Sequence, residues 1–416
     1  MKITDVRITP VAVPDVPVLN VKGVHQPVFL RSIIEIDTDG GLTGLSETYG
    51  ARRTLDGLRR AADALVGLDP FDLNGLARRV DAALPDAGGI NAPTALADHK
   101  LIDVVYGAFE VALLDIQGKH LSRPVCDLLG GTLRDSIPFA GYLFFKFAKP
   151  AEQPGADLFG EVMTPDALVA QARRFVADHG FRSLKLKGGV LEPAQEVETM
   201  RKLQAAFPGL PLRIDPMGAW APETAIALAQ DLDGVLEYLE DPAPGMDGMA
   251  QVAARSPVPL ATNLVVTELP HVFEAHRKGA VQIVLNDHHY WRGMTGAVRL
   301  GHVCGAAGMG VAMHSNSHLG ISMAAMLHVA ACTPGQTYDC DTHYPWVRDE
   351  VIAGGKFAFR DGRIPVPRGP GLGVKIDPDA LARLAALYRE QGVRDRDDTD
   401  EIRKYLPDFE RRIPRW

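Results

Sequence analysis

The sequence predicts an α/β protein in which a (β/α)8-type barrel follows a smaller α+β domain. Three observations support this fold class. From about residue 138 onward, short apolar runs alternate with helical patterns. Eight such runs occur within roughly 200 residues, which favours closure into a barrel over the alternative of an open doubly wound sheet. The first part of the chain instead shows strands and then helices, as a separate α+β unit does.

The α+β unit is expected over residues 1–132. ITDVRITPVAV alternates between apolar and polar residues, as a strand with one buried face does. VFLRSIIEIDTDGGLTGLSETYG predicts two further strands, joined at the turn residues Asp39-Gly40-Gly41. Helical patterns follow at 54–66 and 101–121. These elements predict a domain that is distinct from the barrel.

The barrel is expected over residues 133–350. Its eight predicted strands are PFAGYLFF, RSLKLKG, LPLRIDP, VLEYLED, VPLATNL, VQIVLND, GVAMHS and QTYDCD. Local signals delimit the intervening helices: Thr164 with Pro165 predicts a helix start, His179-Gly180 its end, and Pro222 another start. The remaining residues, 351–416, are rich in Arg, Asp and Pro and are expected to pack back on the first domain.

The composition narrows the class of function. Of 416 residues, 46% are hydrophobic and 23% charged, as in ordinary globular proteins. The formal charge of −8 argues against nucleic acid or an anionic membrane as the partner. The N-terminal stretch MKITDVRITPVAV has no signal-like hydrophobic region, and no run approaches the ~20 residues of a membrane span. We therefore expect a cytoplasmic protein whose four cysteines, Cys126, Cys304, Cys332 and Cys340, are reduced thiols.

Polar side chains end successive predicted strands. Because the carboxyl ends of barrel strands converge on one mouth, these side chains are expected to line one cavity. An aspartate at one strand end often only caps the next helix, and Asp215 taken alone allows that interpretation. Helix capping, however, does not require polar residues on six consecutive strands. The residues are Lys185, Lys187, Asp215, Glu240, Asn263, Asp287 and His314.

Three of these residues predict a metal site. Asp215, Glu240 and Asn263 offer oxygen ligands on three adjacent strands, which suits a hard cation such as Mg²⁺. No cysteine joins them, and His314 lies two strands away, which disfavours zinc. Such a metal would leave positions for the oxygens of a carboxylate substrate.

The remaining four predict acid–base chemistry on either side of the metal. Lys185 and Lys187 lie two positions apart on one strand and point to the same face. Each ammonium disfavours protonation of the other, so a neutral Lys187 is available as a base. On the opposite side, Asp287 is expected to orient His314. Two opposed bases suit removal of a proton α to a carboxylate.

The sequence around these residues resembles the enolase superfamily and, within it, the glucarate dehydratase group. An asparagine third ligand, here Asn263, is typical of that group, as is HSN followed by a further His. The resemblance extends over nearly the whole chain and implies a modified (β/α)7β barrel with an N-terminal capping domain. The stretches that carry it are VHQP, GYLFF, LKLKGGV, IDPMGAW, EDP, ATN, LNDHHYW, MHSNSH, DTH and PGLGV.

The resemblance implies a role for each matching residue. Lys187 and His314 would form the acid–base pair, with Asp287 as the partner of His314. Asp215, Glu240 and Asn263 would bind Mg²⁺, and Lys185 would contact the substrate carboxylate. Other positions that would touch the substrate are His25, Tyr142, Phe144, Asn316 and His343. Ordinary loop positions for His25 and His343, a core position for Phe144 and a helix cap at Ser315 remain alternatives.

This chain departs from the family pattern at two places. Met217 stands where DPNGAW places a substrate-contacting asparagine. His99-Lys100-Leu101 replaces a threonine-rich stretch before a helix of the capping domain. The family's C-terminal substrate-binding arginine does not match any one residue. We therefore predict that glucarate itself is a poor substrate and that another acid sugar is preferred.

The predicted activity is that of a magnesium-dependent acid-sugar dehydratase acting on a small molecule. One alternative is a racemase or epimerase on the same scaffold, because opposed bases can exchange a proton across one carbon. Another is a non-catalytic relative that only binds a ligand. A homo-oligomer is also expected.

Overall fold

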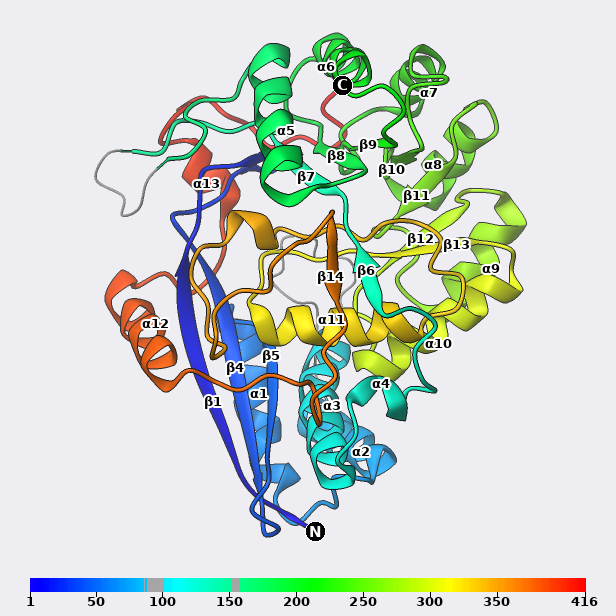
Figure 1. Ribbon diagram of the computed structural model, residues 1–416. Coiled ribbons are helices and arrows are strands. Elements are labelled where there is room, and N and C mark those ends of the chain that lie inside the picture. The colour runs from blue at the N-terminus through cyan, green and yellow to red at the C-terminus, as the bar shows by residue number, and fades with distance from the viewer. Residues whose placement is uncertain (86, 88–99, 151–156) are drawn as a thin grey trace.

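The computed structural model describes residues 1–85, 87, 100–150 and 157–416 (Figure 1). Its central feature is a sheet of seven parallel strands that curls into a barrel, with neighbours in the order β7 to β13. Sequential order of parallel neighbours is the pattern that successive βα units produce. The strands are β7 Gly141–Phe144, β8 Leu184–Lys187, β9 Leu212–Asp215, β10 Tyr238–Glu240, β11 Leu260–Thr262, β12 Ile283–Asn286 and β13 Gly310–Met313.

The eighth predicted strand, QTYDCD, closes the barrel without forming a regular ladder. Gln336 bridges Val311 of β13, and Cys340 bridges Phe139 next to β7. Between these bridges, the carbonyl of Asp339 accepts a hydrogen bond from Arg213 Nη1 at 2.7 Å, so it does not join a strand ladder. The prediction was therefore right about the position of this segment and wrong about its regularity.

The helices of the barrel follow their strands and surround the sheet (Figure 1). Thr164 caps α5 through its Oγ1, which accepts the N–H of Ala167, and Gly180 ends that helix at φ 70°. Both signals had been predicted. The helices are α5 Pro165–His179, α6 Pro193–Ala206, α7 Pro222–Asp231, α8 Gly245–Ala253, α9 Leu269–Lys278, α10 Gly293–Ala306 and α11 Gly320–Cys332.

The N-terminal domain is a three-stranded antiparallel sheet with helices on one face. The strands β1 (Ile3–Pro14), β4 (Val28–Thr38) and β5 (Thr43–Tyr49) pair in the order β1-β4-β5. The turn between β4 and β5 contains Gly41 at φ 72°. The other elements are β2 Leu19–Asn20, β3 Gly23–Val24, α1 Arg52–Ala62, η1 Asp63–Leu65, α2 Leu73–Ala83 and α3 Lys100–Leu121.

Helix α11 lies between the two parts of the molecule, and all thirteen of its residues are buried (Figure 1). It contacts β5 of the N-terminal sheet, α10 of the barrel and the short segments α4 (Val125–Leu128) and β6 (Ser136–Pro138). A helix that is apolar all round is stable only when neighbours cover every face. Helix α11 therefore joins the barrel rigidly to the first domain.

The C-terminal residues contact both parts. Strand β14 (Arg363–Pro365) pairs with β6, and α12 (Pro378–Gln391) packs on β1. Helix α13 (Asp398–Ile402) contacts β3, and the last residues reach the barrel, where Arg415 N–H binds the carbonyl of Ala219 at 2.7 Å. One further short helix, η2, spans Tyr344–Trp346. Among the helices that the structure describes, none is long and apolar enough to cross a membrane.

His328 provides a test of the packing around α11. Its Nδ1 accepts the N–H of Cys126 at 3.3 Å and its Nε2 donates to the carbonyl of Leu372 at 3.2 Å. Burial lowers the pKa of His328 to about 4. In the unfolded chain, where a histidine has a pKa near 6.5, His328 is protonated between about pH 6.5 and pH 4, whereas in the folded protein it stays neutral over that range. Protonation therefore favours the unfolded state, and the free energy of unfolding falls as the pH is lowered.

We predict that His328 contributes about 2 kcal/mol to the loss of unfolding free energy between pH 7 and pH 5. His328→Gln should flatten the pH dependence of urea unfolding by that amount. His302→Gln, which replaces an exposed histidine on α10, is the control and should leave the pH dependence as in the native protein. Equal pH dependence in the native protein and His328→Gln would contradict the prediction.

Candidate active site

The polar strand ends converge as predicted. Tyr142 is level with Lys185, and Lys187 is level with Asp215 across the β7-β8-β9 register. The pairing of Leu239 with Ile214 then places Glu240 beside Asp215. All these side chains are buried, so the mouth of the barrel contains a cluster of charges with little access to water.

The two lysines are neutralised by three carboxylates. Lys187 Nζ lies 2.5 Å from Asp215 Oδ2, and Lys185 Nζ lies 2.5 Å from Glu240 Oε2 and 2.9 Å from Asp341 Oδ2. Asp341 comes from the irregular segment that closes the barrel. Asp341 was not among the predicted site residues, although it belongs to the DTH stretch at 341–343. It is the last residue of the eighth predicted strand, QTYDCD, so the strand-end rule that selected His314 also applies to it.

These carboxylates determine the charge of Lys185. Burial alone would lower the pKa of Lys185, but the Asp341 and Glu240 carboxylates raise it well above its usual value. Lys185 is therefore a cation, and repulsion between the two lysines does not remove its proton. For Asp215, burial opposes ionisation, yet Lys187 and Lys185 hold the pKa of its carboxyl below the usual range.

His314 pairs with Asp341, which corrects the predicted pairing with Asp287. His314 Nδ1 lies 2.8 Å from Asp341 Oδ1. Burial opposes ionisation of Asp341, but Lys185 and His314 hold its pKa below the usual range. An ionised carboxylate only accepts hydrogen bonds, so Nδ1 of His314 carries the proton. Its Nε2 is buried and has no hydrogen-bond partner among the described residues, so it is free to exchange a proton.

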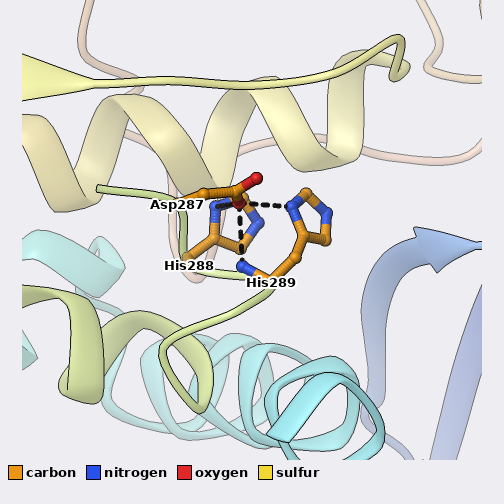
Figure 2. Close-up of side chains that lie close together, drawn as sticks. All are labelled: Asp287, His288 and His289. Atoms are coloured by element: carbon orange, nitrogen blue, oxygen red, sulfur yellow. Dashed lines mark hydrogen bonds and ion pairs between the residues drawn. The ribbon is translucent and has the colours of Figure 1, made fainter. Parts of the chain in front are cut away.

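The Asp287 carboxylate binds His289, two residues later in the chain (Figure 2). Asp287 Oδ1 accepts the backbone N–H of His289 at 2.9 Å and lies 2.7 Å from His289 Nδ1. Tyr49 donates its hydroxyl to Asp287 Oδ2 at 3.5 Å. A carboxylate that binds the backbone two residues later forms a local turn, and this local geometry decides its direction.

Asp287, His288 and His289 each offer one ligand atom, and these atoms lie within 4.8 Å of one another. The rings of His288 and His289 are tilted, with centroids 4.0 Å apart and planes inclined by 33°. Hydrogen bonds join Asp287 to His289, whereas neither ring nitrogen of His288 has a hydrogen-bond partner among the described residues.

Asp215, Glu240 and Asn263 provide a donor set that fits a hard cation. Lys185 Nζ is close to Glu240, yet neither carboxylate oxygen of Glu240 accepts a well-directed hydrogen bond within the described part of the chain. Burial and the nearby Asp215 raise the pKa of Glu240 well above its usual value. A divalent cation would satisfy these oxygens and offset the repulsion between the carboxylates.

Asp241, a residue that sequence reasoning did not single out, holds Asn263 in place. Asp241 accepts hydrogen bonds from Thr262 Oγ1 at 2.5 Å and from the backbone N–H of Asn263 at 2.9 Å. Burial raises the pKa of Asp241 to about 7. Asp241 thus ties the ends of β10 and β11 together beside the expected metal ligands.

Four of the expected substrate-contacting residues form one aromatic cluster. His25 of the N-terminal domain stacks on His343 with centroids 5.6 Å apart and planes inclined by 11°. His343 also contacts Phe144 at 4.8 Å and Tyr142 at 5.1 Å between centroids. The Tyr142 hydroxyl donates to Asp215 Oδ2 at 3.3 Å, so the cluster adjoins the charged mouth. His25 and His343 are therefore not loop histidines at the surface.

A small cavity next to this cluster is lined by Asn316, Tyr49, Arg31 and Arg396. Arg396 forms two hydrogen bonds with Asp398, at 2.6 and 2.7 Å. Arg396 is thus an arginine of the C-terminal segment that lines the same cavity as Asn316. The sequence could not select it, because several arginines lie close together in this segment and no motif distinguishes them.

Ser315 does not cap a helix, because α11 begins only at Gly320. Its hydroxyl and that of Thr342 each lie 3.0 Å from His318 Nε2, and His318 Nδ1 donates to the carbonyl of Leu319. Burial lowers the pKa of His318 to about 4, so this ring is neutral and Nε2 accepts. The second histidine of HSNSH thus fixes the loops that carry His314 and His343.

Met217 and Lys100 represent the two departures from the family pattern. Met217 is buried, has φ 56° and donates its N–H to Asp215 Oδ1 at 2.9 Å. This left-handed conformation favours glycine or asparagine over methionine. Lys100 Nζ binds Asp103 at 2.9 Å and the carbonyl of Tyr290 at 3.2 Å, so its ammonium group is already paired. His99 lies outside the described residues.

Comparison with known proteins agrees with this geometry. The chain matches the family models "Mandelate racemase / muconate lactonizing enzyme, N-terminal domain" over residues 3–130 and "Enolase C-terminal domain-like" over residues 167–380. It is 46% identical to a probable glucarate dehydratase of Streptomyces coelicolor over 430 aligned positions, which cover 100% of this chain and 99% of that protein.

Two solved structures are similar to this chain over its whole length. One is an enolase from Thermobispora bispora complexed with magnesium and formate, with 50% identity, a TM-score of 0.97 and full coverage of both chains. The other is an enolase from Pseudomonas fluorescens with bound magnesium, potassium and tartrate, with 46% identity and a TM-score of 0.96, covering 100% of this chain and 99% of that one. The chain therefore belongs to the enolase superfamily and, within it, to the glucarate dehydratase-like group.

Proposed function

We propose that this enzyme is a magnesium-dependent dehydratase of an acid sugar. The observation that carries the proposal is the arrangement at the mouth: the free Nε2 of His314 and the ammonium of Lys187 adjoin one carboxylate cluster. The similarity to the Streptomyces coelicolor protein and the magnesium and tartrate in the Pseudomonas fluorescens structure support the same conclusion. Tartrate is itself a hydroxylated dicarboxylate.

Asp215, Glu240 and Asn263 would hold Mg²⁺, which supplies positive charge where a substrate carboxylate gains electron density as its α-proton leaves. Lys185 would contact that carboxylate, and its cationic state suits the role. Lys187 in its neutral form, or His314, would remove the α-proton, according to the configuration of the substrate.

His314 then has a second task in the proposed reaction. Asp341 holds the proton on Nδ1, so any further proton resides on Nε2, which faces the site. From there it would protonate the departing β-hydroxyl, which leaves as water. The carbon–oxygen bond breaks as the carbon–carbon double bond forms, and the resulting enol tautomerises to a 2-keto-3-deoxy acid.

We predict that chelation abolishes activity and that magnesium restores it. Asp215→Asn should weaken magnesium binding at least about tenfold, because it removes a charged oxygen ligand from the donor set. Magnesium titration followed by calorimetry measures the affinity. Asp233→Asn, at an exposed carboxylate just after α7, is the control and should bind magnesium as the native enzyme does. Full turnover by metal-free enzyme would refute the proposed mechanism.

The two bases should act on opposite faces of one carbon. Lys187→Ala should keep solvent deuterium exchange only on the epimer whose α-proton faces His314, and His314→Ala only on the other epimer. Each loss should be about 10²- to 10⁴-fold, as for removal of a general base. Mass spectrometry of recovered substrate gives both the exchange and the loss of water. His314→Ala should also lose dehydration of both epimers, whereas the same exchange pattern in the two variants would show that the bases are not opposed.

Met217 should disfavour glucarate because a thioether cannot replace the hydrogen bonds of an asparagine amide. A hydrogen bond to a charged group contributes ~1.5–3 kcal/mol, so Met217→Asn should raise glucarate turnover, relative to the preferred acid sugar, roughly ten- to a hundredfold. The left-handed backbone at this position tolerates asparagine, so the free energy of unfolding should not fall. Met217→Leu keeps the size but adds no amide and should not change the preference. Efficient glucarate turnover by the native enzyme, unchanged in Met217→Asn, would contradict the prediction.

A further inference from the structure

Arg31, on β4 of the N-terminal domain, is a buried cation that contacts the barrel. Only 1% of its side chain is exposed, and its Nε donates to Glu47 Oε1 at 2.7 Å. Its Nη2 lies 3.0 Å from His289 Nε2 and 3.0 Å from Ser322 Oγ at the start of α11. The guanidinium also lies over the ring of Tyr49, 4.9 Å from the centroid. The charge is thus paired, and Nη2 contacts both the loop after β12 and the start of α11.

The hydrogen-bond chemistry of arginine determines which nitrogen of His289 carries the proton. A guanidinium only donates, so His289 Nε2 accepts from Arg31. Ser322 Oγ also lies 3.0 Å from Nε2 and is a second neighbour of this nitrogen. A proton on Nε2 would face the cation at 3.0 Å, which is unfavourable. The proton therefore lies on Nδ1, which is 2.7 Å from Asp287 Oδ1 and donates to it (Figure 2).

This donor controls the direction of Asp287. The carboxylate receives the ring N–H and the backbone N–H of His289 on one oxygen and the Tyr49 hydroxyl on the other. Burial opposes ionisation of Asp287, but its contacts with His289 hold the pKa of this carboxyl below its usual range. Asp287 is therefore an anion that accepts hydrogen bonds from His289, and His289 in turn accepts a hydrogen bond from Arg31.

The same network reaches a residue expected to touch the substrate. Tyr49, whose hydroxyl binds Asp287, accepts a hydrogen bond from Asn316 Nδ2 at 3.2 Å. Glu47, the ion-pair partner of Arg31, accepts the backbone N–H groups of Leu319 at 2.8 Å and Ser322 at 2.9 Å. Both ends of the segment that contains Asn316 and begins α11 are therefore attached to the N-terminal sheet.

We propose that Arg31 is a positioning residue for this site: its guanidinium fixes the Nδ1–H tautomer of His289, which orients the Asp287 carboxylate and, through Tyr49, the amide of Asn316. The effect of Arg31 on catalysis rests on the proposed function, whereas its effect on the tautomer of His289 is independent of that function. The first experiment therefore measures the tautomer alone.

Long-range proton–nitrogen NMR of the full chain, labelled with ¹⁵N-histidine, shows which ring nitrogen carries the proton. The signal of His289 is identified by its loss in His289→Asn. We expect a protonated Nδ1 and an unprotonated Nε2 in the native protein at pH 7. In Arg31→Met, where only Asp287 still favours the Nδ1–H tautomer, we expect a detectable population with the proton on Nε2. A protonated Nε2 in the native protein would overturn the proposal. An unchanged Nδ1–H tautomer in Arg31→Met would also overturn it and would show that Ser322, not Arg31, determines the tautomer.

Arg213→Met is the matched control. Arg213 is also 1% exposed and pairs with Glu237 at 2.6 Å, but it lies on β9 and binds the carbonyl of Asp339 instead of a histidine. Its loss should destabilise the barrel without changing the tautomer of His289. A change of tautomer in Arg213→Met would attribute the effect to general loss of packing and overturn the proposal.

The second experiment measures solvent deuterium exchange into an acid-sugar substrate. Arg31→Met should lower kcat roughly 10- to 100-fold with a much smaller change in KM, as for loss of a residue that supports a catalytic group. Arg31→Lys, which retains a donor, should recover part of that loss. An equal loss in Arg31→Lys and Arg31→Met would contradict positioning by hydrogen bonding.

Two substitutions at His289 leave the Arg31–Glu47 ion pair intact. They test the proposal if Arg31→Met does not fold. An asparagine amide can replace the Nδ1–H donor to Asp287, whereas a glutamine amide replaces the group that faces Arg31. His289→Asn should therefore lose less exchange activity than His289→Gln. The reverse order would overturn the proposal, and inactivity of the native protein on every acid sugar would count against the proposed function alone.

Discussion

Two lysine ammonium groups and three carboxylates share the buried mouth of the barrel, and much of the structure around the site serves to hold them. Burying an unpaired charge costs several kcal/mol, so each group here needs a partner in a defined position. Lys187 has Asp215, while Lys185 lies between Glu240 and Asp341. If all five groups are ionised, the net charge of the cluster is negative by one. A bound divalent cation would make it positive by one.

The supporting residues act by fixing the loops that follow the strands. Asp241 joins the ends of β10 and β11, and His318 joins the loops after β13 and after the closing segment. Glu196 of α6 does the same after β8, where it accepts the backbone N–H groups of Gly189, Val190 and Leu191. Such contacts preorganise charged groups, since a small displacement would leave a buried charge without its partner.

The N-terminal domain is part of the same arrangement and does more than cover the barrel. His25 stacks on His343, and Arg31 and Glu47 bind the loop after β12 and the start of α11. Arg396, far away in the sequence, lines the cavity that also contains Asn316. Because α11 is buried between sheet and barrel, a shift of the sheet would alter these contacts together.

The amino-acid sequence was sufficient to predict the barrel, the separate α+β domain and the convergence of polar strand ends, because these follow from periodicity and from the rule that parallel strands end at one mouth. It also identified Asp215, Glu240 and Asn263 as neighbours, and the family, because the motifs are local. It did not single out Asp341, although this residue ends the eighth predicted strand, because the role of Asp341 depends on its contacts with Lys185 and His314, which are far away in the chain. The partner of His314 and the charge of Lys185 were decided only by the tertiary structure. Asp287 and Asp341 are both plausible partners by type, and the choice depends on the local turn that ties Asp287 to His289 and on contacts between residues far apart in the chain.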